Sequence, residues 1–294
     1  MNPLIFFRRP EYFFRPSQAF RRLRRWLRPP REIETVRLPW GAEIKVHTRE
    51  TIGASIYSYG IFDLPVCEAI ARLLDPGETA TDVGANIGQM STLMRHRAGA
   101  TGRVISFDPN PEIFTELSAN LRDTSPHLAP IRLEQMALSA APGEASLDPG
   151  PEWKSNRGMS RLVADANASA QSWRVKLTTL DALFPAPEPI HVMKMDVEGH
   201  EASVLAGATS LLAERRIRDI IFEDFITYPS PVANTLLAAG YTIFRLHAAW
   251  SRPQLLPPIT PAHGSASDFL ATLDPARTTA RFASRGWQAL RSRA

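Results

Sequence analysis

The sequence has few cysteines and no long apolar runs, the features that mark disulfide-rich and membrane-spanning proteins. Its single cysteine, Cys67, excludes an internal disulfide framework and suits a reducing cytoplasm. Its apolar runs fall well short of the roughly 20 residues that a transmembrane helix needs. With 44% hydrophobic and 22% charged residues among 294, the composition predicts a globular, cytoplasmic protein with one main domain.

Lysine is also scarce: four lysines stand against thirty arginines, which is typical of a GC-rich bacterial genome. The net charge of +4 is unevenly distributed, because residues 1–31 carry nine arginines and one acid. This local charge of +8 leaves −4 for the rest of the chain. A mildly acidic body is not expected to bind nucleic acid.

The basic N-terminal arm, residues 1–31, also contains seven aromatic residues. Ser17 can cap a short helix with Phe20, Leu23 and Leu27 on one face and arginines on the others, ended by Pro29. One interpretation is a peripheral contact of residues 1–28 with the inner face of a membrane. The alternative is an arm that packs on its own domain.

Residues 32–275 are expected to form the main domain. Short strands are predicted over 32–60 and a helix over 66–74, after which strands alternate with helices. The predicted strands are 78–83, 103–107, 131–138, 190–197 and 217–223, and the helices 89–97, 111–121 and 202–215. Such alternation predicts a doubly wound, mostly parallel α/β sheet of the Rossmann-like type.

Three segments depart from the alternation. Residues 142–178 are polar and rich in glycine, and they end in a period-2 strand at 173–178, which predicts an inserted hairpin or lid. Residues 241–246 and 269–273 predict a final antiparallel pair. The last segment, 276–294, is expected to be a basic tail.

A glycine-rich turn follows the first strand of the alternation, in the segment Thr81–Met90, TDVGANIGQM. Gly84 and Gly88 allow a ligand to approach the backbone, and Asn86 tolerates positive φ better than most residues. The spacing Gly-x-x-x-Gly is not the dinucleotide fingerprint. A glycine turn alone is weak evidence for any particular ligand.

One strand later, Phe107–Pro111, FDPNP, places Asp108 at a carboxyl end. A carboxylate there can accept both hydroxyls of a ribose, and no cation is placed for a diphosphate. These features favour a nucleoside without phosphates. The alternative is that Asp108 caps the helix that begins near Pro109.

The third motif is the charged run in Val192–Glu201, VMKMDVEGHE. Lys194, Asp196 and Glu198 share one side of a central strand and its exit, where charged residues need a reason. A structural ion-pair cluster is one reading, and membership of the ligand site is the other.

The four blocks DVGANIG, FDPNP, TTLDAL and KMDVEGHE, in this order, resemble the FkbM family of S-adenosylmethionine-dependent methyltransferases over about residues 78–225. The resemblance implies a seven-stranded class I fold. It also implies methyl transfer, commonly to a hydroxyl of a sugar, polyketide or other secondary metabolite. Many relatives have glutamate where this chain has Asp108. The cofactor would contact the glycine turn and the next strand exit, at Asp82, Gly84, Ala85, Asn86, Gly88, Asp108 and Pro109.

Transfer to a hydroxyl requires removal of its proton, and therefore a general base. The candidate catalytic residues lie at predicted strand exits: Lys194, Asp196, Glu198, His200 and Glu223. His200 has the most suitable ordinary pKa but lies where a helix begins. No metal is expected, since Glu223, Asp224 and Asp196 have no chelating spacing.

The acceptor is expected to be a small molecule or glycan, with Trp153, Asn156 and Arg157 of the insertion as candidates to contact it. Two other classes of protein stay open from the residues alone. A nicotinamide-dependent oxidoreductase is disfavoured by the glycine spacing and by the lack of a recognisable Tyr-x-x-x-Lys pair. A non-catalytic membrane-associated binding protein would use the basic arm.

Overall fold

An eight-stranded sheet forms the centre of the computed structural model, which describes residues 10–14, 29–153, 155–224, 228–258 and 267–291. The strand order is β13-β12-β14-β11-β10-β3-β4-β5. The strands from β11 to β5 run parallel, whereas β14 is antiparallel to both β11 and β12. The predicted doubly wound sheet and its antiparallel final pair are confirmed, and β13, which pairs with β12 at the edge, is an eighth strand beyond the seven that were expected. The strands are β3 (Thr79–Val83), β4 (Arg103–Phe107), β5 (Ile131–Glu134), β10 (Ile190–Met195), β11 (Ile217–Asp224), β12 (Thr242–Ala249), β13 (Arg252–Leu256) and β14 (Ser267–Thr272).

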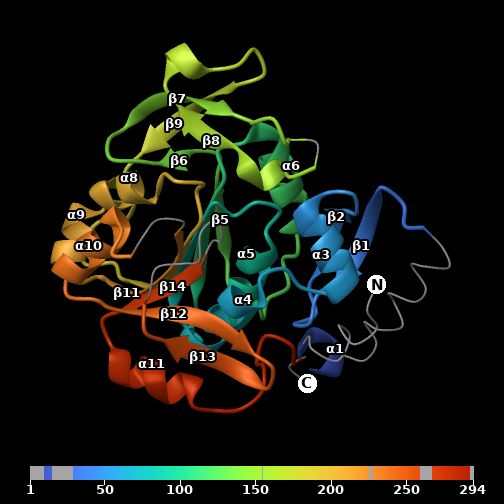
Figure 1. Ribbon diagram of the computed structural model, residues 1–294, viewed down its shortest axis with the longest axis vertical. Coiled ribbons are helices and arrows are strands. Elements are labelled where there is room, and N and C mark those ends of the chain that lie inside the picture. The colour runs from blue at the N-terminus through green and yellow to red at the C-terminus, as the bar shows by residue number, and fades with distance from the viewer. Residues whose placement is uncertain (1–9, 15–28, 154, 225–227, 259–266, 292–294) are drawn as a thin grey trace.

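Helices cover both faces of this sheet (Figure 1). One face packs on α4 (Leu64–Leu73), α5 (Gln89–Ala98) and α11 (Pro275–Phe282), through a core that includes Val192 and Ile221. The other face packs on α8 (Glu201–Ala206), α9 (Thr209–Ala213) and α10 (Pro231–Ala238), through Met193 and Phe222. Side chains two residues apart on a strand share a face, so Lys194 lies on the same face as Val192 and Glu223 on the same face as Ile221. This is the face that α4 covers. The remaining helices of this region are α6 (Pro111–Asn120) and α7 (Leu180–Leu183).

A smaller sheet, in the order β6-β9-β7-β8, lies beyond β5 at the top of Figure 1. Its first strand, β6 (Ala137–Leu138), follows β5 directly, so the single strand predicted over 131–138 is divided between two sheets. The segment 142–178, predicted to be an insertion, supplies the rest of it. These elements are β7 (Gly143–Asp148), β8 (Arg161–Val163) and β9 (Trp173–Thr178), with the 3₁₀ turns η2 (Arg157–Met159) and η3 (Asp165–Asn167).

The prediction of strands over 32–60 is right for only part of that segment. β1 (Ile33–Arg37) and β2 (Glu43–His47) form an antiparallel hairpin, but α3 (Thr51–Tyr59) is a helix. The Glu50 side chain caps α3 by accepting the Gly53 N–H. At Gly53 a Cβ would lie 2.1 Å from the His47 carbonyl oxygen, so this glycine allows the helix to pack on the hairpin.

The helix predicted over 202–215 is also interrupted, because α8 ends and α9 begins on either side of Gly207. A Cβ at Gly207 would lie 2.0 Å from the Ser139 carbonyl oxygen. The close passage of the backbone after β6 therefore explains both the glycine and the break.

The N-terminal arm is described only at α1 (Pro10–Phe14). There Tyr12 is buried, and its ring meets that of Tyr59 edge-on with centroids 5.6 Å apart. The predicted amphipathic helix with Ser17, Phe20, Leu23 and Leu27 lies outside the described residues. Within the described segments, no helix has the length and apolar character needed to cross a bilayer.

Much of the segment expected to be a basic tail packs into the α4 face of the core, where Trp287 and Leu290 are buried. Glu68 and Arg72, both buried on α4, form a 2.6 Å ion pair beneath it. Arg72 also donates to the Gly286 carbonyl, and the Glu68 carboxylate accepts the N–H groups of residues 288 and 289. The segment after β14 is thus joined to the centre of the domain.

Candidate functional site

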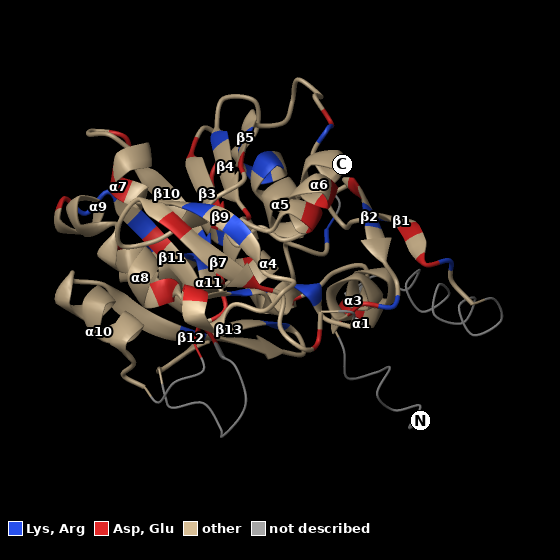
Figure 2. Cartoon of the chain, turned by 90° about the horizontal axis from the view of Figure 1, so that it is seen from above, with Lys and Arg blue, Asp and Glu red and all other residues tan. Residues whose placement is uncertain are grey.

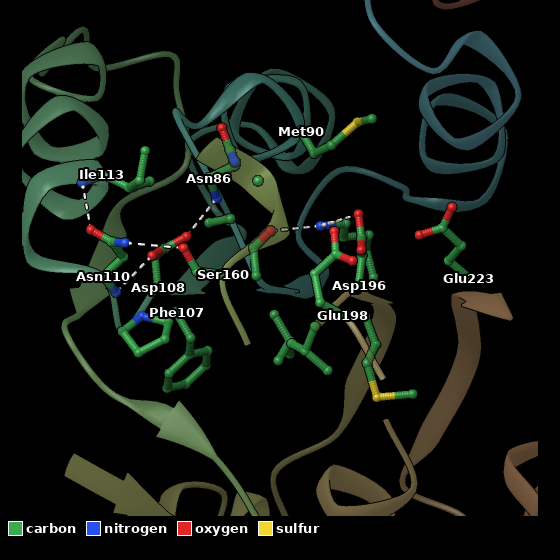
Figure 3. Close-up of a pocket in the computed structure, with 18 of the residues that line it drawn as sticks. Asn86, Met90, Phe107, Asp108, Asn110, Ile113, Ser160, Asp196, Glu198 and Glu223 are labelled. Carbon is green, nitrogen blue, oxygen red and sulfur yellow. Dashed lines mark hydrogen bonds and ion pairs between the residues drawn. The ribbon is translucent and has the colours of Figure 1, made fainter. Parts of the chain in front are cut away.

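A cavity of 370 Å³ opens where β3, β4, β10 and β11 end, and the small sheet lines one side of it. Of the predicted cofactor residues, Gly84, Ala85, Asn86, Asp108 and Pro109 line the cavity, whereas Asp82 and Gly88 are not among its lining residues. All the predicted catalytic residues line it as well: Lys194, Asp196, Glu198, His200 and Glu223. In Figure 3, Asp108 and Glu223 lie toward opposite ends, with Asp196 and Glu198 between them.

The glycine turn has the backbone conformation that its sequence predicts. Gly84, Asn86 and Gly88 all have positive φ, at 77°, 50° and 89°. The space at Gly84, however, is filled by the protein, because a Cβ there would lie 1.9 Å from the Asp196 carbonyl oxygen. At Gly88 a Cβ would lie 2.9 Å from Leu117 Cδ1. The lack of a Cβ at these glycines therefore allows the strand exits and α6 to pack closely, and the approach of a ligand to the turn stays a prediction.

Asp108 joins the turn to the end of β4. Its Oδ2 accepts the Asn86 N–H at 2.9 Å and its Oδ1 accepts the Asn110 N–H at 3.0 Å (Figure 3). Burial raises the pKa of Asp108 to about 7, although these two hydrogen bonds oppose the increase. Asn110, not Asp108, caps α6, since its side chain accepts the N–H groups of Glu112 and Ile113. The alternative that Asp108 is the helix cap is wrong.

Lys194 connects β10 to the glycine turn. Its Nζ donates to the Gly84 carbonyl at 2.7 Å and lies 3.6 Å from Asp82 Oδ1 and 3.7 Å from Asp196 Oδ2. Burial opposes its charge, but Asp196 and Asp82 outweigh this effect and raise the pKa of Lys194. Asp82 also accepts a 2.5 Å hydrogen bond from Ser91 Oγ. The ion-pair reading of this motif is therefore confirmed for Lys194 and Asp196, and Asp82, which lies outside the motif on β3, is a second partner of the lysine.

Carboxyl groups line the other end of the cavity. Burial, with Asp196 and then Glu201 nearby, raises the pKa of Glu198 to about 7. Glu198 also has φ 54°, which is unusual for a residue with a side chain. Burial, followed by repulsion from Asp196, raises the pKa of Glu223 to about 8. At neutral pH this end of the cavity retains protons that exposed acids would release.

Asp63 and Asp268 also line the cavity, although neither belongs to a motif that is visible in the sequence. Asp63 precedes α4 with φ 50°, and its Oδ1 accepts the Val66 N–H at 3.2 Å. Asp268 lies on β14 opposite Glu223 in the antiparallel register. The available signals were an acid just before the Leu64–Pro65 helix start and an acid opening an apolar strand. Neither forms a motif with the other blocks, because only the fold brings them together.

His200 lies at the start of α8, where its Nε2 is 3.0 Å from Ser139 Oγ. Burial lowers the pKa of His200, which favours the neutral ring. His200 lines the cavity, but its Nε2 is in a hydrogen bond with the Ser139 hydroxyl.

The η2 segment closes the cavity above the glycine turn. Asn110 Nδ2 donates to Ser160 Oγ at 3.3 Å, and Arg157 forms a bidentate pair with Glu116 at 2.6 and 2.9 Å. Asn156 and Arg157, two of the predicted acceptor contacts, line the cavity. The third, Trp153, is not among the lining residues and packs on Trp173 with ring centroids 5.1 Å apart.

The described residues fit an adenosyl cofactor. Apolar side chains suited to a base line the same cavity as Asp108, among them Phe107, Ile113 and Leu138. The two cations among the described lining residues, Lys194 and Arg157, are both engaged by the protein, so neither is left for a phosphate. Across the described segments, no three acidic, histidine or cysteine side chains converge as metal ligands. In the view of Figure 2, basic and acidic residues of the described chain are interspersed.

The strand order, with the antiparallel β14 between β11 and β12 and the cavity at the carboxyl ends of the parallel strands, defines a class I S-adenosylmethionine-dependent methyltransferase. The chain belongs to the FkbM family: the sequence profile of the methyltransferase FkbM domain matches residues 82–243. Its cofactor is S-adenosylmethionine, and the nicotinamide alternative is excluded.

One protein is similar to this chain in sequence, and two solved structures are similar to it in fold. The hexuronic acid methyltransferase AglP of Haloferax volcanii is 30% identical over 199 residues, which are 65% of this chain and 76% of that protein. An S-adenosylmethionine-dependent O-methyltransferase from Thermotoga maritima superposes with a TM-score of 0.42 at 10% identity, over 71% of this chain and 63% of that one. A Streptococcus mutans methyltransferase solved with S-adenosylhomocysteine has a TM-score of 0.39 at 10% identity, over 72% of this chain and 100% of that one.

Proposed function

We propose that this methyltransferase transfers a methyl group to a hydroxyl of a sugar or a sugar-containing small molecule. The observation that carries the proposal is the continuity of one cavity from Asp108 to Glu223. One end has the groups that suit an adenosyl moiety, and the other has carboxyl groups that suit hydroxyl-bearing acceptors. The similarity to a hexuronic acid methyltransferase supports a sugar acceptor.

The cofactor supplies an electrophilic methyl group. We assign the ribose hydroxyls to Asp108, whose two oxygens each accept one backbone N–H and retain a further lone pair. Gly84, Ala85 and Asn86 present backbone beside it, and Pro109 belongs to the same wall. Asp82 and Gly88 act indirectly, the first through Lys194 and the second through the packing of α6.

The chain then has to orient the acceptor, exclude water and accept a proton. The η2 segment and the small sheet cover the cavity, which limits access of water to the reacting groups. Lys194 holds the β3 and β10 exits together, which fixes the floor between the two ends of the cavity. Glu198 and Glu223, whose pKa values are raised toward neutral pH, are placed to accept the proton.

Calorimetry with S-adenosylmethionine and with NAD⁺ tests the cofactor assignment. Transfer of label from methyl-tritiated cofactor to p-nitrophenyl glucoside, galactoside and glucuronide tests the acceptor class. Binding of S-adenosylmethionine and label on at least one glycoside are expected. Label found only on protein, nucleic acid or amine acceptors would contradict the sugar assignment.

We further propose that residues 1–28 contact an anionic membrane surface peripherally. The support is the charge of +8 carried by residues 1–31 together with their aromatic residues. The buried Tyr12 belongs to the same arm, so part of it also packs on the domain.

A further inference from the structure

Two acidic residues are direct partners across the antiparallel pair of β11 and β14. Glu223 lies opposite Asp268 in the register, and both side chains line the cavity. Directly opposite side chains have Cβ atoms roughly 4.5–5.5 Å apart, and like charges in this position are destabilising. Two half-buried carboxylates at this distance are not expected to be ionised together.

We propose that Glu223 and Asp268 form a proton-sharing carboxyl pair that binds the acceptor hydroxyl and takes its proton. This inference rests on the proposed methylation of a hydroxyl and adds the residue that completes the base. Asp268 lies near the start of β14, on the same face as the buried Leu270, and no sequence motif marks it. Only the β11–β14 register brings the two acids together.

The charged groups around the pair maintain this state. Asp63 lies across from it at the start of α4, Asp196 and Glu198 lie at the β10 exit, and Lys194 is the nearby cation. That lysine is already within ion-pair distance of Asp82 and Asp196 and donates to the Gly84 carbonyl. Among the described residues, the positive charge of Lys194 is therefore shared with other carboxylates and does not fully offset a negative charge on Glu223 or Asp268. Burial and the surrounding acids raise the pKa of both carboxyl groups, that of Glu223 to about 8.

A pair that holds one proton has two complementary functions. Its protonated member donates a hydrogen bond to an acceptor oxygen, and its ionised member accepts one from the reacting hydroxyl. In the reaction the O–H bond breaks and the proton passes to the ionised carboxylate. The electron pair of that bond stays on the acceptor oxygen, which forms the new bond to the methyl carbon. The methyl–sulfur bond breaks, and its electrons remain on sulfur.

The same arrangement selects against acidic groups close to the reacting hydroxyl. The pair lies with Asp63, Asp196 and Glu198 in one cavity, so an acceptor carboxylate at this point would meet like charge. If the carboxylate of a glucuronide has to enter the cavity beside Glu223 and Asp268, the enzyme is expected to methylate the matching glucoside faster than the glucuronide.

The first test needs no acceptor. Urea unfolding of the cofactor-free protein is measured between pH 5.5 and 7.5 for the wild type, E223Q/D268N and the control E43Q, whose glutamate is exposed on β2. A proton held by the folded state but not by the unfolded chain raises the unfolding constant about tenfold per pH unit. In the double variant, the number of protons calculated from the pH dependence of the unfolding constant should fall by about one. In E43Q this number should equal that of the wild type. An unchanged slope in the double variant would overturn the proposal.

The second test uses the best p-nitrophenyl glycoside of the acceptor panel. E223Q and D268N should each lower kcat by about 100-fold or more, with cofactor affinity by calorimetry nearly unchanged. In each single variant the remaining acid loses a charged neighbour, so the acidic limb of the rate profile should move to lower pH. Activity within about threefold of wild type in both, or an unmoved limb, would exclude the pair. Failure of the wild type to bind the cofactor would instead refute the proposed function.

Discussion

Asp108 Oδ2 accepts the backbone N–H of Asn86 at 2.9 Å, across the gap between the exits of two neighbouring strands. This contact joins the glycine turn, in which Gly84, Asn86 and Gly88 have positive φ, to the end of β4. The carboxylate therefore has two functions, because the group that we assign to the ribose also shapes the turn beside it. Changes at Asp108 should affect the cofactor through both.

Replacement of Asp108 by alanine should weaken S-adenosylmethionine binding by at least about 10-fold. A charge-assisted hydrogen bond contributes roughly 1.5–3 kcal/mol, and the alanine variant also releases the Asn86 N–H. Calorimetry with the purified variant measures the change. Asp108→Glu should bind more tightly than the alanine variant, and equal affinity in all three proteins would remove Asp108 from the site.

Cofactor affinity should also depend on pH through the same residue. Burial raises the pKa of Asp108 to about 7, and ribose hydroxyls donate to its ionised form. The dissociation constant should therefore increase as the pH falls below about 7 and level off above it. In Asp108→Asn this dependence should be absent. Parallel pH profiles in the two proteins would mean that another group controls binding.

Gly84→Ala should destabilise the fold more than it affects any single ligand contact. The new Cβ would lie 1.9 Å from the Asp196 carbonyl oxygen at a residue with φ 77°. Steric overlap and the left-handed backbone together should cost about 2–5 kcal/mol of unfolding free energy. Gly41→Ala, with φ 103° and no atom within 4 Å, isolates the backbone contribution, and Gly143→Ala has open space. If all three are equally stable in urea, the close approach is not important.

Asp63→Asn should shift the acidic limb of the rate profile to lower pH. Asparagine tolerates the left-handed conformation at φ 50° and retains an oxygen for the Val66 N–H, so the start of α4 should be preserved. Loss of this negative charge should lower the pKa of Asp268 and Glu223, which Asp63 raises. The measurement is kcat against pH. A large loss of kcat at all pH values would make Asp63 itself the base.

Arg72→Met should reduce the unfolding free energy by about 3–5 kcal/mol, because it leaves the buried Glu68 carboxylate without its cation. Arg103→Met provides the matched control, since the Arg103–Glu188 pair is about two-fifths exposed at both side chains. An exposed pair should change stability by less than about 1 kcal/mol. Similar urea midpoints for the two variants would show that the buried pair contributes no more to the free energy of unfolding than the exposed pair does.

Replacement of Arg21, Arg22, Arg24 and Arg25 by glutamine should weaken binding to anionic vesicles by about 100-fold or more. Each basic residue near such a surface contributes roughly 1 kcal/mol, and salt should weaken binding of the unchanged protein. Sedimentation with phosphatidylglycerol vesicles measures it, and phosphatidylcholine vesicles are the control. No sedimentation of the unchanged protein, or equal sedimentation with both lipids, would end the membrane proposal.

The main sheet could be predicted because its strands are short, apolar and separated by amphipathic helices. The helix α3 at Gly53 and the helix break at Gly207 could not be predicted. Each glycine lies against a backbone carbonyl group, of His47 or Ser139, that only the folded chain brings near. The same holds at Gly84, where the turn was predictable but its neighbour Asp196 was not.

The candidate site divides in the same way. Asp108 and Glu198 follow strands in recognisable blocks, so position in the sequence was enough to identify them. Asp268 needed the register of β14 on β11, and Asp63 needed the start of α4 to lie over those strands. Pairing between strands that are distant in the chain carries no local pattern. Sequence therefore predicts the end of the cavity around Asp108 better than the end around Asp268.

The buried pair on α4 also has a consequence during synthesis. The carboxylate of Glu68 accepts the N–H groups of Gln288 and Ala289, which leave the ribosome more than 200 residues later. At translation rates of about 5–20 residues per second this interval lasts roughly 10–45 s. Until it ends, the nascent chain exposes the apolar face that Trp287 will cover. Completion of the α4 face of the core is therefore expected to wait for the synthesis of the segment around Trp287.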